Sequence, residues 1–111
     1  MPDKISEMHA EICRTLGSAA RIEILNALRD GEKTVSEITK ALGVRQANVS
    51  QHLAVLRQRR VVATRKEGTS IYYKVSNPKI IHACELMRQV LLEQLKESEE
   101  LTKLASPARK R

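Results

Sequence analysis

Residues 34–58, with the sequence TVSEITKALGVRQANVSQHLAVLRQ, contain the pattern that decides the fold. Thr34 and Glu37 have the spacing of a capping box, in which the threonine hydroxyl and the glutamate carboxylate each accept a hydrogen bond from a free backbone amide. The short helix that begins there ends at Gly43. A second helix, over residues 45–59, follows at once. Two helices joined by so tight a turn predict a helix-turn-helix.

Two amphipathic helices are predicted before this pair. Apolar residues recur at intervals of three and four over residues 3–16, and Gly17 ends that helix. Ser18 can cap the next helix, which ends at the Asp-Gly pair of residues 30–31. The side chains of this second helix that are expected to face inward are Ile22, Leu25 and Leu28.

After the helix-turn-helix the apolar period changes from about 3.6 to 2, the period of a strand. Residues 61–66 and 70–76 are rich in β-branched and aromatic side chains, and residues 67–69, Glu-Gly-Thr, provide a turn between them. The pattern predicts a β-hairpin.

Asn77 and Pro78 combine a capping side chain with a proline at the first helical position, so a last helix begins there and extends as far as Leu104. The predicted fold is α+β, mostly α: a winged helix-turn-helix in which the hairpin is the wing. Residues 1–104 form this domain, and residues 105–111 are a basic, disordered tail. Without Trp or Phe in 111 residues the core is small, so the apolar stripes of the first and last helices predict a homodimer through those helices.

The net charge of +7 is concentrated in one third of the chain, because residues 45–79 contain eight basic and one acidic side chain. Such a basic segment favours an acidic partner, and double-stranded DNA is the one that suits this fold. Apolar runs are too short for a transmembrane helix or a signal peptide, which predicts a cytoplasmic protein without a membrane partner. No nucleophile with a base, no paired acids and no phosphate-binding loop is apparent, so we expect no enzyme.

The helix over residues 45–59 is the candidate for reading DNA in the major groove. Asn48 and Gln51 lie opposite its apolar side, and amides can bond adenine in a bidentate manner; the alternative is that both are ordinary solvated residues. Arg45 stands where a capping Ser, Thr or Asp is usual, which suggests a contact to DNA. The full set of predicted DNA-binding residues is Arg45, Gln46, Asn48, Ser50 and Gln51 on the helix, with Arg65, Lys66 and Lys74 of the hairpin as phosphate contacts.

Residues 17–93 resemble the ArsR/SmtB family of winged-helix repressors, over LGSAARIEILNAL, TVSEITKALGVRQANVSQHLAVLRQRRVV and EGTSIYYKVSNP. The resemblance implies five helices and a hairpin, a homodimer made by the first and last helices, and binding to operator repeats. It also implies release from DNA when a metal ion, a metalloid or an oxidant is sensed.

The metal sites of that family are not matched. Thr34-Val35-Ser36-Glu37 stands where the family's metalloid site has Cys-Val-Cys-Asp. At the positions of the zinc ligands of the last helix this chain has Asn77, Lys79, Val90 and Glu93, and one ligand of four does not form a closed zinc shell. No resident metal or other cofactor is therefore predicted.

Cys13 and Cys84, with His9 and His82 nearby in sequence, remain as candidates for sensing. In a dimer the thiols could bind a thiophilic metal or metalloid, or join through a disulfide or polysulfide link; the alternative is that both are buried apolar residues. We therefore predict a sequence-specific DNA-binding regulator, a repressor released by a thiol-reactive inducer. Two alternatives stay open: an architectural DNA-binding protein without an inducer, and a helical module that binds RNA or acidic proteins.

Overall fold

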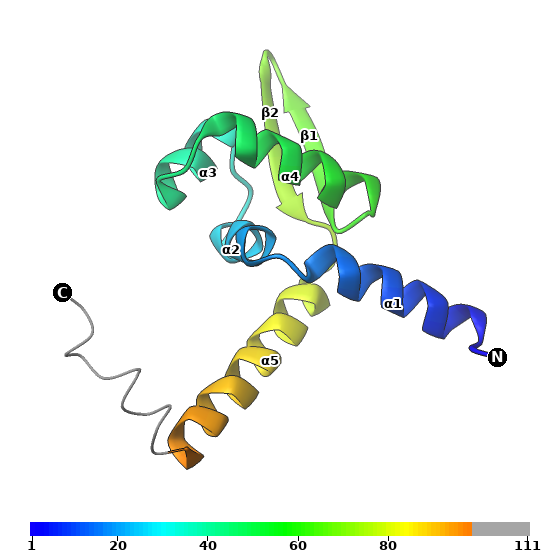
Figure 1. The fold of residues 1–111 in the computed structure, drawn as a ribbon. Coiled ribbons are helices and arrows are strands. Elements are labelled where there is room, and N and C mark those ends of the chain that lie inside the picture. The colour runs from blue at the N-terminus through cyan, green and yellow to red at the C-terminus, as the bar shows by residue number, and fades with distance from the viewer. Residues whose placement is uncertain (99–111) are drawn as a thin grey trace. The chain divides into compact units, whose positions relative to one another are not determined.

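The computed structural model describes residues 1–98, and the chain forms two compact units, residues 1–81 and the residues from His82 on. The order of elements is the predicted one (Figure 1). The predicted helix limit at Leu104 and the predicted tail over residues 105–111 lie outside the described residues. The elements are α1 (Lys4–Leu16), α2 (Ala19–Ala27), α3 (Val35–Leu42), α4 (Gln46–Gln58), β1 (Val62–Glu67), β2 (Ser70–Val75) and α5 (Pro78–Glu97).

The predicted capping side chains are confirmed at the helix ends. The Ser18 hydroxyl accepts a hydrogen bond from the backbone N–H of Arg21 at 3.3 Å and so opens α2. The capping box of α3 is complete, since the N–H of Glu37 donates to Thr34 Oγ1 at 3.2 Å and the N–H of Thr34 donates to Glu37 Oε1 at 2.9 Å. Gly43 ends α3 with φ 68°, a conformation in which a side chain is strained. The helix-turn-helix is thus set by local hydrogen bonds.

The core of residues 1–81 is aliphatic and joins α2, α3 and α4 to the base of the hairpin. For α2 the prediction was partly wrong: Ile22 is 39% exposed, and Ile24, at 1%, faces the core beside Leu25 and Leu28. Ile22 and Ile24 lie 200° apart on a helix, so only one of them can face the core. The buried apolar residues are Ile24, Leu25, Leu28, Ile38, Val49, Leu53, Leu56, Val61 and Val62.

The hairpin β1–β2, which we call the wing, is antiparallel, with Val62 opposite Val75 and Glu67 opposite Ser70. Glu67 therefore still pairs in the ladder, and the turn is shorter than predicted, with Gly68 at φ 62°. Backbone hydrogen bonds of 2.9 and 2.8 Å join Lys33 to Tyr73 in a single antiparallel β-bridge, which ties the segment before α3 to β2. This pairing connects the wing to the helix-turn-helix.

Arg60 reverses the chain between α4 and the wing, and it is the one non-glycine residue with positive φ, 64°, in the described part of the chain. The N–H of Val61 donates to the carbonyl of Leu56 at 2.8 Å, which closes the end of α4 as in a Schellman motif. The Ser76 hydroxyl donates to the Arg60 carbonyl at 2.6 Å. The wing therefore starts in a fixed direction from α4.

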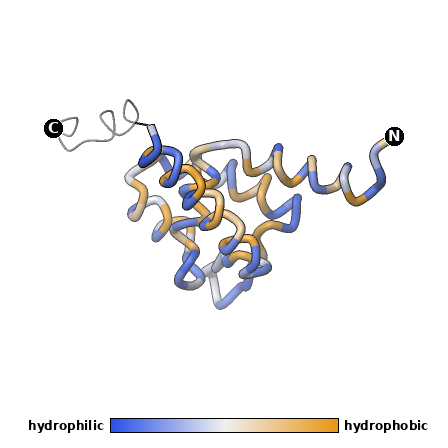
Figure 2. Tube along the Cα trace, turned by 90° about the horizontal axis from the view of Figure 1, so that it is seen from below, coloured by the Kyte–Doolittle hydropathy of each residue, from blue (hydrophilic) through white to orange (hydrophobic). Residues whose placement is uncertain are grey.

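Both terminal helices carry exposed apolar side chains. In α1, Ile12 and Leu16 pack on the core, whereas Ile5 and Met8 nearer the N-terminus are 72% and 54% exposed. Figure 2 shows hydrophobic positions recurring along α1 to its N-terminal end. In the unit from His82 on, α5 exposes Leu86, Met87, Val90, Leu91 and Leu92. None of the helices within residues 1–98 is both long and apolar enough to span a membrane.

Candidate nucleic-acid interface

The two sides of α4 differ sharply. Val49, Leu53 and Leu56 are at most 1% exposed and hold the helix on the core, as their spacing predicts. The other side is exposed and uncharged over the first three turns, so its hydrogen-bonding groups are open to a partner. The exposed residues of α4 before Arg57 are Gln46, Ala47, Asn48, Ser50, Gln51 and Ala54.

Arg45 is the N-cap residue of α4 and makes no capping hydrogen bond with its side chain. Its backbone is extended, with φ −68° and ψ 140°, and the residue is exposed. A cation here opposes the helix dipole, and the first-turn amides are left without a side-chain acceptor. The N-terminus of α4 is thus open on its outer side.

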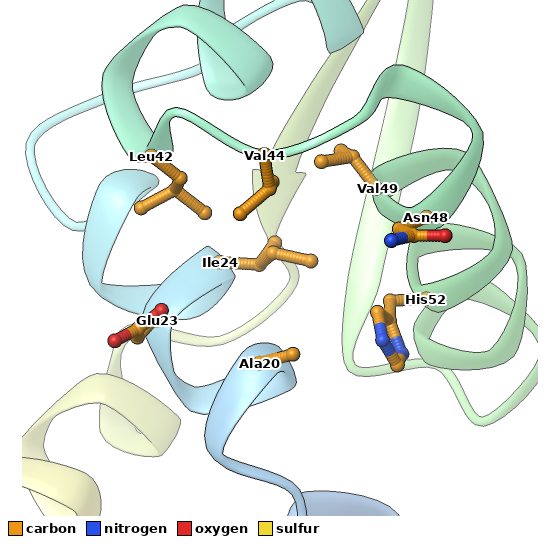
Figure 3. A pocket seen from close by; sticks show the side chains of 8 residues that line it. All are labelled: Ala20, Glu23, Ile24, Leu42, Val44, Asn48, Val49 and His52. Carbon is orange, nitrogen blue, oxygen red and sulfur yellow. The ribbon is translucent and has the colours of Figure 1, made fainter.

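Asn48 borders a small cavity of about 90 Å³ between α2, the helix-turn-helix turn and α4 (Figure 3). Apolar side chains, among them Val44 and Val49, line one part of the cavity, and His52 lies next to Asn48 on α4. Asn48 therefore lies on the flank of α4 nearer α2. Gln51 is exposed and lies about 160° around the helix from both Val49 and Leu53, so it is at the crest of the outer side. The eight lining residues are Ala20, Glu23, Ile24, Leu42, Val44, Asn48, Val49 and His52.

Two sets of contacts connect α4 to α1, the first of them through Arg21 of α2. Arg21 Nε donates to His52 Nδ1 at 3.2 Å, and Arg21 Nη1 donates to the carbonyl of Thr15 at 3.0 Å, at the end of α1. At the far end of α4, Arg59 Nη1 lies 3.3 Å from Glu11 Oε2 of α1. The middle and the C-terminal end of α4 are therefore connected to the helix that also carries Ile5 and Met8, the middle through Arg21 of α2.

Arg65 of the wing is paired with carboxylates. Its guanidinium meets Glu32 at two points, Nε to Oε1 at 3.1 Å and Nη2 to Oε2 at 2.5 Å, and it also contacts Glu67. The guanidinium carbon lies 4.7 Å from the centre of the Tyr72 ring, a cation–π arrangement. The hydrogen bond from Arg65 lowers the pKa of the Glu32 carboxyl, and both carboxylates raise the pKa of Arg65. Three of the five N–H donors of Arg65 are thus engaged, and a DNA phosphate competes with these carboxylates for the guanidinium.

Lys66 and Lys74, the other predicted wing contacts, are both exposed. Lys74 is close enough to Glu32 to contribute to its lowered pKa. Lys66 has no carboxylate within ion-pair distance in the described part of the chain, and it lies near the tip of the wing, opposite Ile71. Of the three predicted wing cations, Lys66 is thus the least neutralised.

The two cysteines differ in environment. Cys13 is exposed on α1, and Cys84 of α5 is half-buried, which raises the pKa of its thiol. The residues lie in separate units, so a link between them stays a prediction. Within residues 1–98, no three or more His, Cys, Asp or Glu side chains gather in a way that could hold a metal ion.

Two features of the site were missed from the sequence. Glu32 precedes Arg65 by 33 residues, and no local pattern indicates that they meet. From the sequence, Arg57 was only one of the eight basic residues of the segment 45–79, and no role of its own was predicted for it. In the structure it lies beside the wing, where it lines a groove with Tyr73. The signal that could have singled out Arg57 is its position on α4, one turn after Leu53 and two turns after Ser50 on the same flank.

The helices, the turn and the wing define a winged helix-turn-helix DNA-binding protein. Residues 18–64 match the family described as bacterial regulatory protein, arsR family. The chain is 40% identical to the HTH-type transcriptional regulator KmtR of Mycobacterium tuberculosis over 77 residues, 69% of this chain and 59% of KmtR. It is 34% identical to the HTH-type transcriptional regulator Rv0081 of the same organism over 90 residues, 80% of this chain and 79% of Rv0081.

Solved structures of other proteins have the same fold as this chain. The crystal structure of Rv0081 superposes with a TM-score of 0.76 at 33% identity, covering 86% of this chain and 97% of that one. The homodimeric winged helix-turn-helix DNA-binding domain of Mb0332 from Mycobacterium bovis superposes with a TM-score of 0.77 at 26% identity, covering 89% and 94%. The chain belongs to the ArsR family and is a DNA-binding transcriptional regulator.

Proposed function

We propose that this regulator is a dimeric repressor that reads its operator with α4 and holds the DNA backbone with its wing. The observation that carries the proposal is the exposed, uncharged polar side of α4, which adjoins a positively charged wing and which nothing within residues 1–98 covers. An α-helix fits the major groove, where amide side chains can discriminate base pairs. Repression is the direction of control that the resemblance of the sequence implies.

In this account Gln51 and Asn48 read base edges, and Gln46 reaches a base from the first turn of α4. Gln51 is at the outer crest, so it enters the groove most deeply, whereas Asn48 reads from the flank near α2. Arg45 and Ser50 contact phosphates on either side of the helix. The open N-terminus of α4 supports this, since the exposed Arg45 side chain makes no hydrogen bond to the helix that would compete with a phosphate.

The wing supplies affinity more than specificity. Lys66, without a carboxylate partner in residues 1–98, is proposed as the main phosphate contact of the wing tip, with Lys74 behind it. Arg65 keeps the wing aligned through Glu32 and Tyr72, and any phosphate contact it makes is secondary. Lysine contacts to phosphates release counterions, so they strengthen binding to any sequence.

The exposed apolar residues of α1 and of α5 are proposed to form the homodimer interface. Ile5 and Met8 on α1, and Met87 and Leu91 on α5, are each more than half exposed in the single chain. Contiguous apolar surfaces of this kind favour association, and the Mb0332 domain is described as homodimeric. A dimer presents two α4 helices, which predicts an operator with two symmetric half-sites.

The proposed inducer is a thiol-reactive species, with Cys13 and Cys84 as the residues that sense it. Oxidants, sulfur species and thiophilic metals or metalloids all react with thiolates, and these two are the only cysteines in the chain. Cys13→Ser and Cys84→Ser should leave DNA binding intact and each abolish release. If both variants release DNA as the wild type does under arsenite, peroxide and polysulfide, sensing by these thiols is contradicted.

The experiment that tests DNA reading is selection of duplexes from a random pool by the full chain, followed by fluorescence anisotropy on the enriched sequence. The expected result is an enriched, two-fold symmetric sequence that binds more tightly than a random duplex of equal length. Equal affinity for both would favour an architectural DNA-binding protein, and preference for RNA over both would favour the helical interaction module. Either result would contradict the proposal.

A further inference from the structure

A second and larger cavity of about 400 Å³ lies between α4 and the wing. We call it the α4–wing groove. One wall is the flank of α4 that faces the hairpin, and the other is Tyr73 of β2, held in place by its backbone pairing with Lys33. The lining residues are Ser50, Leu53, Ala54, Arg57, Gln58 and Tyr73.

The chemistry of the α4–wing groove favours an anion. Its lining includes the buried Leu53 and the small side chain of Ala54, together with hydroxyl, amide and guanidinium groups. No carboxylate is among the residues that line it. A cavity with one guanidinium and several neutral donors suits a singly charged oxyanion such as a phosphodiester.

Arg57 differs from Arg59 and Arg65 because it has no acidic partner in the described part of the chain. Arg59 pairs with Glu11 at 3.3 Å, and Arg65 pairs with Glu32 and with Glu67. Arg57 is exposed and none of the carboxylates of residues 1–98 lies within ion-pair distance of it. Within residues 1–98 its guanidinium is therefore available to an anion that enters the groove.

The position of the groove identifies the source of that charge. Neighbouring grooves of a duplex are separated by a single sugar–phosphate strand. When α4 lies in a major groove and the wing beside it reaches the next groove, this strand has to pass between α4 and the wing. The α4–wing groove is the space that such a strand would enter.

We propose that the α4–wing groove seats one backbone phosphodiester of the bound duplex, with Arg57 as its cation and the hydroxyls of Ser50 and Tyr73 as additional donors. This inference rests on the proposed DNA-binding function and adds a contact to it. The contact is independent of sequence, and it fixes how far α4 can advance into the major groove.

Arg57→Gln is the variant that tests this contact, and Arg59→Gln is its matched control, because Arg59 is nearby, equally basic and paired with Glu11. Binding to the selected operator and to a random duplex is measured by anisotropy over a range of salt concentrations. Arg57→Gln should weaken both duplexes equally, by about tenfold, the scale of one hydrogen bond to a charged group. It should also flatten the slope of log K against log salt by about 0.9 for each phosphate that a subunit no longer neutralises.

Arg59→Gln should leave the salt slope unchanged. Arg57→Lys keeps the positive charge and loses the bidentate hydrogen-bond donor. It should therefore retain the salt slope and lose less affinity than Arg57→Gln. Circular dichroism of each variant reports whether the fold is intact. An Arg57→Gln protein that is folded and has the wild-type slope would overturn the proposal. If Arg57→Gln fails to fold, an Arg57→Lys protein with wild-type affinity for both duplexes would overturn it.

Replacing single phosphates of the operator by neutral methylphosphonates locates the contact. At one position in each half-site the replacement should weaken binding of the wild-type protein. At the same position it should cause no further loss of binding by Arg57→Gln. Additive losses at every position would contradict a direct contact. In that case Gln51→Ala and Lys66→Ala should still weaken operator binding, whereas no duplex binding by the wild type would contradict the proposed function itself.

Discussion

Arg65 of β1 and Glu32 of the segment before α3 form a two-point ion pair, Nε to Oε1 at 3.1 Å and Nη2 to Oε2 at 2.5 Å, across the face of Tyr72. The pair joins the wing to the helix-turn-helix. It also engages the guanidinium of Arg65, which the sequence suggests as a contact to a DNA phosphate. One side chain therefore cannot serve both purposes at full strength.

Glu32→Gln should raise affinity for random DNA, because it removes a negative charge near the duplex and frees part of the Arg65 guanidinium. The salt slope should become steeper, by up to about 0.9 for each further phosphate that a subunit neutralises. In the wild type, Lys66→Ala should flatten the slope by a similar amount, and Arg65→Ala should change it less. Anisotropy titrations over a salt series measure all three. A larger slope change for Arg65→Ala than for Lys66→Ala would show that the arginine is a main phosphate contact.

The same pair predicts a pH dependence of stability. Because Arg65 lowers the pKa of Glu32 in the folded state, the pair stabilises the fold above the carboxyl's ordinary pKa, and this contribution is lost as the pH falls through the lowered value. Thermal unfolding of wild type and Glu32→Gln should therefore differ at neutral pH and converge in acid. A constant difference at all pH values would exclude the carboxylate as its cause.

Base reading by α4 is tested with Asn48→Ala and Gln51→Ala. Each should cost about 1–3 kcal/mol on the selected operator and far less on a random duplex, because only contacts to base edges are removed. Gln51→Ala should have the larger effect, since Gln51 lies at the crest of α4 and Asn48 on its flank. Equal losses on operator and random DNA would remove both residues from the set of readers.

Arg60 has φ 64°, where an L-residue is strained by about 1–2 kcal/mol and glycine is not. Since glycine also loses more chain entropy on folding, Arg60→Gly should raise the free energy of unfolding by a net of about 0.5–1 kcal/mol. Urea denaturation measures the change through its midpoint at a constant slope. A lower midpoint would mean that the arginine side chain contributes more than its backbone strain costs.

The thiols should react at different rates. Partial burial raises the pKa of Cys84, so less of it is thiolate at neutral pH, whereas Cys13 is exposed. Iodoacetamide should therefore modify Cys13 first, and the rate at Cys84 should keep rising above neutral pH. Mass spectrometry of proteolytic peptides follows both residues in one sample. Faster modification of Cys84 at neutral pH would contradict this order.

Local signals predicted the framework of the fold well. Thr34 with Glu37, Gly43, and Asn77 with Pro78 mark helix ends through hydrogen bonds and backbone conformations within a few residues, so the sequence alone is sufficient to identify them. The error at Ile22 has a different origin. Helix periodicity allows two overlapping apolar stripes on α2, and contacts with α3 and α4 decide which of them is buried.

The site could be predicted only in part. The exposed side of α4 follows from the apolar spacing of the same helix, so its candidate residues were identifiable. The pairing of Arg65 with Glu32 spans 33 positions and depends on how the wing and the α2–α3 segment pack, which no local pattern encodes. The same is true of Arg57, because its role depends on the distance between α4 and Tyr73.

The central claim, that two α4 helices of a dimer read one operator, is tested most directly by hydroxyl-radical footprinting of the full chain on the selected duplex. The account predicts two protected half-sites related by two-fold symmetry, with centres one helical turn, roughly 10 bp, or a multiple of it apart. Gln51→Ala should erase both half-sites together at a protein concentration that saturates the wild type. A single unsymmetric footprint, or uniform protection along the duplex, would contradict it.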